Sequence, residues 1–208
     1  PIKDGATTVN IAFRGKELTV PVVVKDAAKD RRVSFQQDVV PVFTAAGCNT
    51  GACHGSARGQ DGFMISLFGY DPKGDYQRVT REFAGRRINL ALPEESLLLT
   101  KTIGSVPHTG GKLFEKDSAF YSTLLEWIKD GASYDPAEIA LPIKIEVEPK
   151  EFLLEGSGRK IPLTVKATYS DGTDRDVSTL SNYTSSNDNS ISIDASSGIS
   201  SSKTQGEA

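Results

Sequence analysis

The sequence predicts a multidomain protein of the α plus β class, with a mainly helical middle and all-β segments at both ends. Apolar residues alternate with a period of two over 8–13 and are dense and β-branched over 18–24. After residue 33 the apolar spacing becomes helical, and from Pro142 it returns to a period of two. A chain of 208 residues is long enough for two or three compact units.

The N-terminal segment, residues 1–28, is expected to form a β-hairpin. Its two apolar runs are joined by a short turn that contains Gly15, and a tight hairpin turn favours a residue that tolerates positive φ. An isolated two-stranded hairpin is only marginally stable in water. We therefore expect this hairpin to pack against another element.

The middle segment, residues 29–135, is expected to contain four helices. Ser34 and Gln37 have the spacing of a capping box at the start of the first helix, and Pro41 is expected to kink it. Further helices are expected over 74–84, 94–103 and 118–130.

The C-terminal segment, residues 142–208, is expected to form a β-sandwich. Its short apolar runs are spaced by 8 to 12 residues, and Asp171-Gly172 marks a turn between two of them. The serine-rich stretch 178–206 has the composition of a disordered segment, but isoleucines recur in it regularly enough to favour strands.

Charge and hydrophobicity exclude two classes of partner. The net charge is −3, and neither sign is concentrated in a tail or a patch, so we expect no nucleic-acid partner. No apolar run reaches the roughly 18 residues of a membrane-spanning helix, so we expect no transmembrane segment in this chain.

The candidate site combines the two cysteines and the two histidines of the chain. Cys48, Cys53 and His54 form a C-x₄-C-H motif, and His108 is the other histidine. Three alternatives without haem are a disulfide, a zinc site made by all four side chains, and a redox cysteine pair. The redox pair is disfavoured because its usual spacing is C-x-x-C.

The fourth hypothesis is one covalent haem c per chain. The motif C-x-x-C-H attaches haem through two thioethers and gives its histidine to the iron, and the spacing here is two residues longer. A domain of about a hundred residues has a modest core of its own. Haem would add the apolar surface that such a core lacks, and we therefore favour Cys48 and Cys53 as attachment sites with His54 as metal ligand.

The other haem contacts have competing candidates. His108, in a loop with Pro107 and two glycines, is favoured as the second iron ligand over Met64, with an open iron position as a third option. Arg86 and Arg87, from a cluster that also contains Arg78 and Arg81, are candidates to pair with haem propionates. The alternative for these arginines is a solvated helix face.

The middle segment resembles the cytochrome c-like domains of large planctomycete surface and periplasmic proteins. The resemblance covers roughly residues 33–135 and is carried by Val33-Ser34-Phe35, Asp38 to Phe43, Gly47-Cys48, Gly51 to Gly55, Leu124 to Ile128 and Gly131-Ala132. It implies a mainly helical cytochrome c-like domain with a C-x₄-C-H haem motif, flanked by Ig-like domains.

Residues 142–208 resemble the group 2 bacterial Ig-like domains. The resemblance is carried by Ile143 to Val147, Leu163 to Thr173, Asp176-Val177 and Ser185 to Asn187, and the family pattern stops at Gly206-Glu207-Ala208. Residues 6–24 are similar to the two strands that the family adds after that point. The resemblance therefore implies an incomplete Ig-like domain that residues 6–24 of the same or another chain complete. An all-β sandwich would then be assembled from the N- and C-terminal segments, and we favour a homodimer formed by strand complementation.

These observations together predict an exported c-type cytochrome domain, periplasmic or at the cell surface, carried on Ig-like spacers. Its expected role is single-electron transfer with a redox partner protein, or binding of a small ligand if the sixth iron position is open, and not the transformation of a substrate. The alternatives are a structural or adhesive extracellular module with a Cys48-Cys53 disulfide and a zinc-stapled interaction domain.

Overall fold

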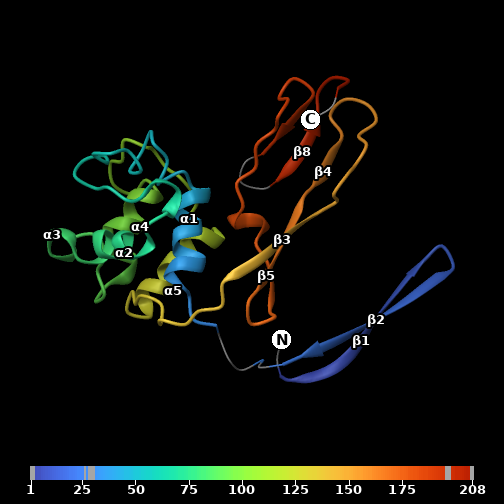
Figure 1. The fold of residues 1–208 in the computed structure, drawn as a ribbon, viewed down its shortest axis with the longest axis horizontal. Helices are drawn as coiled ribbons and strands as arrows, with labels where there is room; N and C mark the ends of the chain where they lie inside the picture. The colour runs from blue at the N-terminus through green and yellow to red at the C-terminus, as the bar shows by residue number, and fades with distance from the viewer. Residues whose placement is uncertain (1–2, 26, 28–30, 195–197, 207–208) are drawn as a thin grey trace. The chain divides into compact units, whose positions relative to one another are not determined.

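The computed structural model describes residues 3–25, 27, 31–194 and 198–206. The chain divides into two compact units, residues 1–32 and residues 33–208 (Figure 1). No helix among the described residues is long and apolar enough to cross a membrane.

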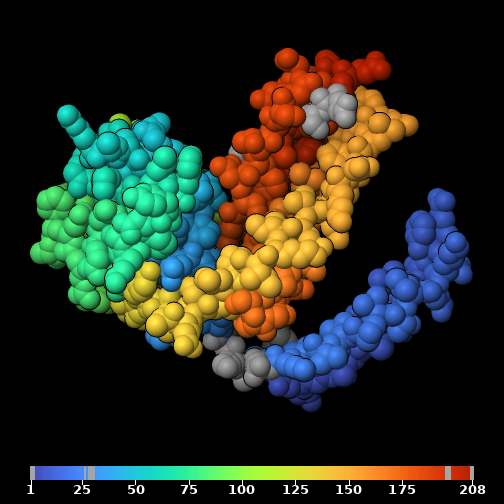
Figure 2. Space-filling model, in the orientation of Figure 1, coloured from blue at the N-terminus to red at the C-terminus, as the bar shows by residue number. Residues whose placement is uncertain are grey.

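The first unit contains the predicted hairpin. Strand β1 (Gly5–Phe13) pairs antiparallel with β2 (Lys16–Val24) along its whole length. Arg14 and Gly15 both have positive φ in the turn, which suits the twist of a tight hairpin. The hairpin is only two strands wide, and its side chains lie at the surface (Figure 2).

The second unit begins with the helix that Ser34 was predicted to cap. The Ser34 side chain accepts a hydrogen bond of 2.9 Å from the amide of Gln37. A π-helical turn, η1 (Phe35–Val39), then runs into α1 (Val40–Ala45), and Pro41 lies in the first turn of α1. The expected irregularity at Pro41 is therefore a change of helix type, because proline is tolerated where its missing N–H would have no helical partner.

The remaining helical elements are short and separated by irregular segments. Their bounds are η2 (Leu67–Gly69), α2 (Pro72–Thr80), α3 (Glu82–Gly85), η3 (Pro93–Glu95), α4 (Leu97–Thr102) and α5 (Ala119–Lys129). The predicted helix 118–130 corresponds to α5, with Ser118 accepting from the amide of Tyr121 as its cap. The predicted helix 74–84 is divided into α2 and α3.

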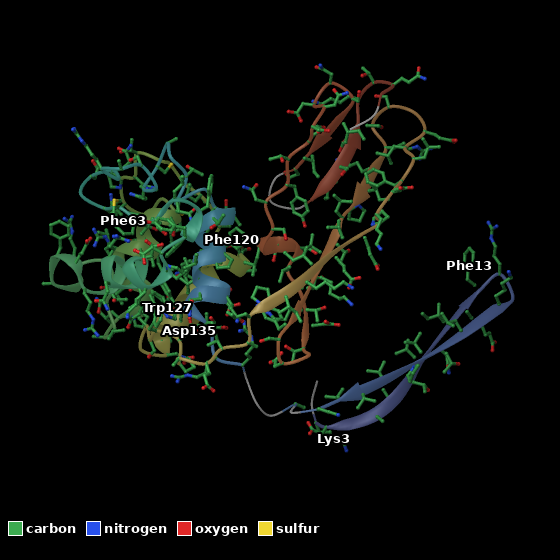
Figure 3. The ribbon with its side chains drawn as sticks, viewed as in Figure 1. Lys3, Phe13, Phe63, Phe120, Trp127 and Asp135 are labelled. Carbon is green, nitrogen blue, oxygen red and sulfur yellow. The ribbon has the colours of Figure 1, made fainter. Side chains whose placement is uncertain are left out.

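Aromatic side chains form the centre of the core of this helical part. Phe35 lies 5.3 Å from the rings of both Tyr76 and Trp127, and the Trp127 indole donates to the carbonyl of Ser133. Trp127 is labelled in Figure 3. Burying a large apolar side chain of this kind contributes roughly 2–3 kcal/mol. This packing fixes η1 and α1, and with them the start of the cysteine motif.

The C-terminal part contains two three-stranded antiparallel sheets and a short 3-10 turn, η4 (Ser178–Leu180). One sheet has the order β3 (Pro142–Glu148), β5 (Thr164–Tyr169), β6 (Asp174–Asp176). The other has the order β4 (Lys160–Pro162), β8 (Ile199–Ser202), β7 (Ile191–Ile193). Among its described residues, the serine-rich stretch 178–206 therefore contains strands, β7 and β8, as predicted.

A partly buried ion pair joins this β part to the helical part. Arg175, on β6, places its guanidinium 2.6 Å from the carboxylate of Asp38, on η1. Asp38 also accepts from the amide of Ser34 at 2.8 Å, and Leu180 packs against the helical core. The β part and the helical part therefore belong to one unit.

The prediction of a mainly helical cytochrome c-like domain is wrong. The structure is 25% helical and 23% strand, and the five α-helices of the described residues are short. Glycines with positive φ, such as Gly47, Gly59 and Gly62, shape the irregular segments, and Phe83 and Ala84 also have positive φ. These backbone conformations end a right-handed helix, and they explain why apolar spacing overestimated the helices.

The prediction of one all-β sandwich assembled from the N- and C-terminal segments is also wrong for this chain. Among the described strands, β1 pairs with β2 and with no strand of the C-terminal part, which forms its own two small sheets. Because β1 and β2 are matched over nine residue pairs, the hairpin can form without any strand of the C-terminal part.

Candidate cofactor pocket

The cysteines and histidines predicted as site residues line one pocket in the helical part. Its volume is about 760 Å³, within the size range of small-molecule and cofactor sites. Apolar side chains make much of its wall: Phe43, Ala46, Ala52, Phe63, Ile65, Phe83, Leu97, Leu98 and Leu113. Cys48, Cys53, His54 and His108 lie among them, so the structure brings together the four residues that the sequence singled out.

A compact turn holds the C-x₄-C-H motif. The amide of Cys53 donates to the carbonyl of Thr50, and the amide of His54 donates to the carbonyl of Cys48, each at 3.0 Å. Gly55 packs so closely against Asn49 that a Cβ would lie 2.1 Å from its carbonyl oxygen. The two residues that this motif has in addition to C-x-x-C-H therefore lie in a turn, which places the His54 amide against the carbonyl of Cys48.

The His54 ring is fixed by Phe63. Its Nδ1 lies 2.9 Å from the carbonyl oxygen of Phe63, and the two ring centroids are 4.6 Å apart (Figure 3, where Phe63 is labelled). A carbonyl can only accept, so Nδ1 carries the proton and Nε2 of the neutral ring keeps its lone pair. This is the usual arrangement of a metal-binding histidine.

His108 has the same arrangement on the other side of the site. Its Nδ1 lies 2.8 Å from the carbonyl oxygen of Gly111, so its Nε2 also keeps a lone pair. A Cβ on Gly110 would lie 3.1 Å from the His108 ring, which explains the small residue there. Lys101, on α4, donates to the carbonyl of Pro107 at 3.2 Å and anchors the loop.

The two imidazole rings are nearly parallel, with an interplanar angle of 11° and centroids 6.2 Å apart. The pair is stacked, and both rings line the same pocket, so one bound group can contact both of them. The pair, the pocket size and the apolar wall therefore fit haem.

The electrostatic surroundings favour the neutral form of His54. Burial lowers the pKa of His54 below its ordinary value, and the positive charges of His108 and Arg87 lower it further, against opposing effects of Phe63 and Asp61. Neutral imidazole is the form that binds a metal.

The structure holds Cys48 and Cys53 as free thiols. Burial, together with the neighbouring Cys53, raises the pKa of Cys48 to about 12. A thiol with such a pKa is protonated at neutral pH and is a poor nucleophile. This property disfavours a catalytic redox pair.

We predict that Cys48 of the cofactor-free, folded chain is alkylated slowly. A pKa of about 12 in place of 9.0 lowers its thiolate fraction near pH 8 by roughly a thousandfold. Iodoacetamide labelling followed by peptide mass spectrometry measures the rate, and the same peptide from the urea-unfolded chain is the control. Equal rates in the folded and unfolded chains would contradict the prediction.

The two arginines predicted to contact a cofactor have different surroundings. Arg86 and Arg87 both line the pocket. Arg87 is buried and its guanidinium donates to the carbonyls of Arg78 and Gly62, whereas no side-chain hydrogen bond of Arg86 is found among the described residues. Arg78 itself pairs with Asp71 and Asp75. Of the cluster, Arg86 is thus the arginine left for a propionate.

Two alternatives fit the geometry less well. Met64 is not among the described residues that line the pocket, so it does not compete with His108 as a ligand. Within the described part of the chain, no group of three or more His, Cys, Asp or Glu side chains could hold a metal ion. This finding argues against a zinc site, whereas haem supplies four nitrogen ligands itself and needs only two from the protein.

Sequence reasoning missed Phe63, Phe83 and Lys101. Phe63 has no metal-binding side chain, but its backbone carbonyl orients His54. Its aromatic character in the glycine-rich stretch 59–69 was the available signal. Neither Phe83, with its positive φ, nor Lys101 had a local pattern that indicated a pocket.

No family model matches this chain, and no curated protein matches it at a significant level. The functional argument therefore depends on the residues and geometry of the pocket.

Proposed function

We propose that residues 33–135 bind one haem c, attached to Cys48 and Cys53, with His54 and His108 as the two iron ligands. Haem bound in this way supplies a couple that exchanges single electrons. The proposed function is single-electron transfer with a redox partner protein, without transformation of a substrate.

The observation that carries this proposal is the pair of parallel imidazoles, 6.2 Å apart, with each Nδ1 held by a backbone carbonyl. Both thiols lie in the same pocket as the rings. Two pocket histidines whose Nδ1 atoms are both held by backbone carbonyls, beside two cysteines, are difficult to explain by core packing alone, because core packing places no requirement on the tautomer.

The residues of the chain have distinct roles in this proposal. His54 and His108 would hold the iron, and the apolar wall of the pocket would exclude water from the bound group. Arg86, at the pocket, is placed to pair with a propionate. The resemblance to exported planctomycete domains supports a periplasmic or cell-surface location.

The test is to express the chain with a c-type haem maturation system. We expect a red protein with a Soret band, and denaturing mass spectrometry should show the mass of one haem retained. A colourless chain two hydrogens lighter than its sequence would instead support the structural module with a Cys48-Cys53 disulfide.

We also propose a homodimer in which the hairpin of one copy covers strand β3 of a second copy. The register places Val9, Ile11 and Phe13 of β1 on one face with Leu18 and Val20 of β2, and these side chains are between 38% and 69% exposed. Strand β3 is at the edge of its sheet and exposes Ile143, Ile145 and Val147. Uncovered apolar edges of this kind favour strand addition.

We predict that the wild-type chain is a dimer by light scattering and that Ile11→Lys makes it a monomer. The substitution places a charge in the centre of the apolar face. Thr8→Lys adds the same charge to the opposite face of the same strand and should leave the dimer intact. A wild-type monomer, or equal effects of both substitutions, would exclude this dimer.

A further inference from the structure

The guanidinium of Arg87 contacts two backbone carbonyls and one carboxylate. One nitrogen of its guanidinium donates to the carbonyl of Arg78 at 2.7 Å, and another donates to the carbonyl of Gly62 at 3.2 Å. Glu82 approaches the guanidinium at 3.4 Å. Arg87 therefore connects the end of α2 to the segment that begins at Gly62.

The guanidinium also stacks on Phe63. Its central carbon lies 4.1 Å from the centroid of the Phe63 ring and 5.4 Å from that of Phe83. A planar guanidinium can stack on an aromatic ring and donate in its own plane at the same time, which a lysine ammonium cannot do. The Arg87 side chain therefore fixes both the ring of Phe63 and the carbonyl of Gly62, the residue before it.

The segment that Arg87 fixes is the one that orients His54. The Phe63 carbonyl accepts from Nδ1 of His54 at 2.9 Å, and the amide of Ile65 donates to the His54 carbonyl at 2.9 Å. Gly59 packs against the same carbonyl group, because a Cβ there would lie 2.1 Å from the Phe63 oxygen. A displacement of Phe63 would therefore remove the acceptor that selects the His54 tautomer.

We propose that Arg87 is a positioning residue for His54: acting through Phe63, it keeps Nδ1 protonated and leaves the lone pair of the neutral ring on Nε2. The role of Nε2 as an iron ligand rests on the proposed function, but the tautomer does not. Arg87 thus has a role different from the propionate contact predicted from the sequence.

The test uses the cofactor-free chain labelled with ¹⁵N-histidine at a pH where both rings are neutral. With only two histidines, His108→Ala assigns the spectrum. We expect wild-type His54 to be protonated mainly at Nδ1. In Arg87→Gln this preference should be lost, with the proton shared between the two nitrogens or moved to Nε2.

Two further variants distinguish a positioning role of Arg87 from an effect of its charge and from a failure of the chain to fold. Arg86→Gln removes the same charge from the same pocket and should leave the His54 nitrogen shifts unchanged. Arg87→Lys keeps the charge but not the stacking, so it should also lose the Nδ1 preference. If Arg87→Gln does not fold, as judged by circular dichroism, Arg87→Lys decides. Wild-type shifts in a folded Arg87→Lys chain would overturn the proposal.

Haemin titrated into the cofactor-free chain distinguishes this proposal from the proposed function. Loss of a group that orients a metal-binding histidine typically costs about 10- to 100-fold in affinity, and we expect a weakening of that size for Arg87→Gln but not for a distant surface variant, Lys144→Gln. If the wild type shows the Nδ1 tautomer but binds no haemin, the proposed function fails while the role of Arg87 stands. If the wild type binds haemin and Arg87→Gln keeps both tautomer and affinity, the role of Arg87 fails.

Discussion

The His54→Ala chain, matured alongside the wild type, should lose the spectrum of six-coordinate, low-spin iron that we expect of the wild type. His54 is held on one side of the pocket by the motif turn and by Phe63, and no other histidine than His108 exists to replace it. Absorption and electron paramagnetic resonance spectra measure the change. An unchanged spectrum in His54→Ala would exclude His54 as an iron ligand.

His108→Ala is the matched control for that variant. It removes an identical ring from an exposed loop whose hydrogen bonds among the described residues are made within the loop and to α4, including the one from Lys101. We expect covalent haem to be retained, with the iron becoming high-spin and open to carbon monoxide. In the wild type, two histidines should give a lower reduction potential than a histidine and a methionine, since a thioether favours reduced iron.

The residues of the candidate site could be predicted from the sequence because cysteine and histidine are rare in this chain. With two cysteines and two histidines in the chain, any site built from these residue types had few possible members, and the structure places all four at one pocket. The orientation of the His54 and His108 rings could not be predicted from the sequence. It depends on the carbonyls of Phe63 and Gly111, and backbone acceptors leave no signature in the identity of a residue.

The role of Arg87 was missed for a related reason. As a residue type, arginine in a basic cluster favours carboxylate partners, and Arg86 and Arg87 are equivalent in that respect. Only the fold shows that Arg87 stacks on Phe63 and donates to Gly62 while its neighbour does not. Adjacent residues of one type can differ in function once one of them is buried.

The fold was predicted well where local chemistry determines it and poorly where it does not. The Ser34 cap, the hairpin turn at Gly15 and the helix after Ser118 depend on neighbours within four residues, and they are present. The predicted helix 74–84 ends as α2 at Thr80, and the following α3 does not continue it as a right-handed helix, because Phe83 and Ala84 take positive φ. That conformation is unfavourable for both residue types, so tertiary packing must impose it, and apolar periodicity cannot anticipate it.

Replacing Arg175 by Met should destabilise the helical core, although Arg175 lies in the β part. Its partner Asp38 has a side chain only 5% exposed, and the two charged groups are 2.6 Å apart. Removing Arg175 takes one partner from the Asp38 carboxylate, which still accepts from the amide of Ser34, so we expect a cost between the about 0–1 kcal/mol of an exposed pair and the about 3–5 kcal/mol of a fully buried one. Met keeps much of the apolar stem of Arg, so the change is mainly in charge.

Urea unfolding followed by the fluorescence of Trp127, the single tryptophan, measures this cost in the helical core itself. Lys166→Met is the control, because Lys166 pairs with Asp174 in the same sheet but both side chains are 49% exposed. An exposed pair contributes about 0–1 kcal/mol, so this variant should change the unfolding midpoint little. If Arg175→Met costs no more than Lys166→Met, the β part does not stabilise the helical part, and the ion pair between them is only a surface contact. If the larger cost is found, the β part is required for the stability of η1 and α1, and therefore for the turn that carries Cys48, Cys53 and His54.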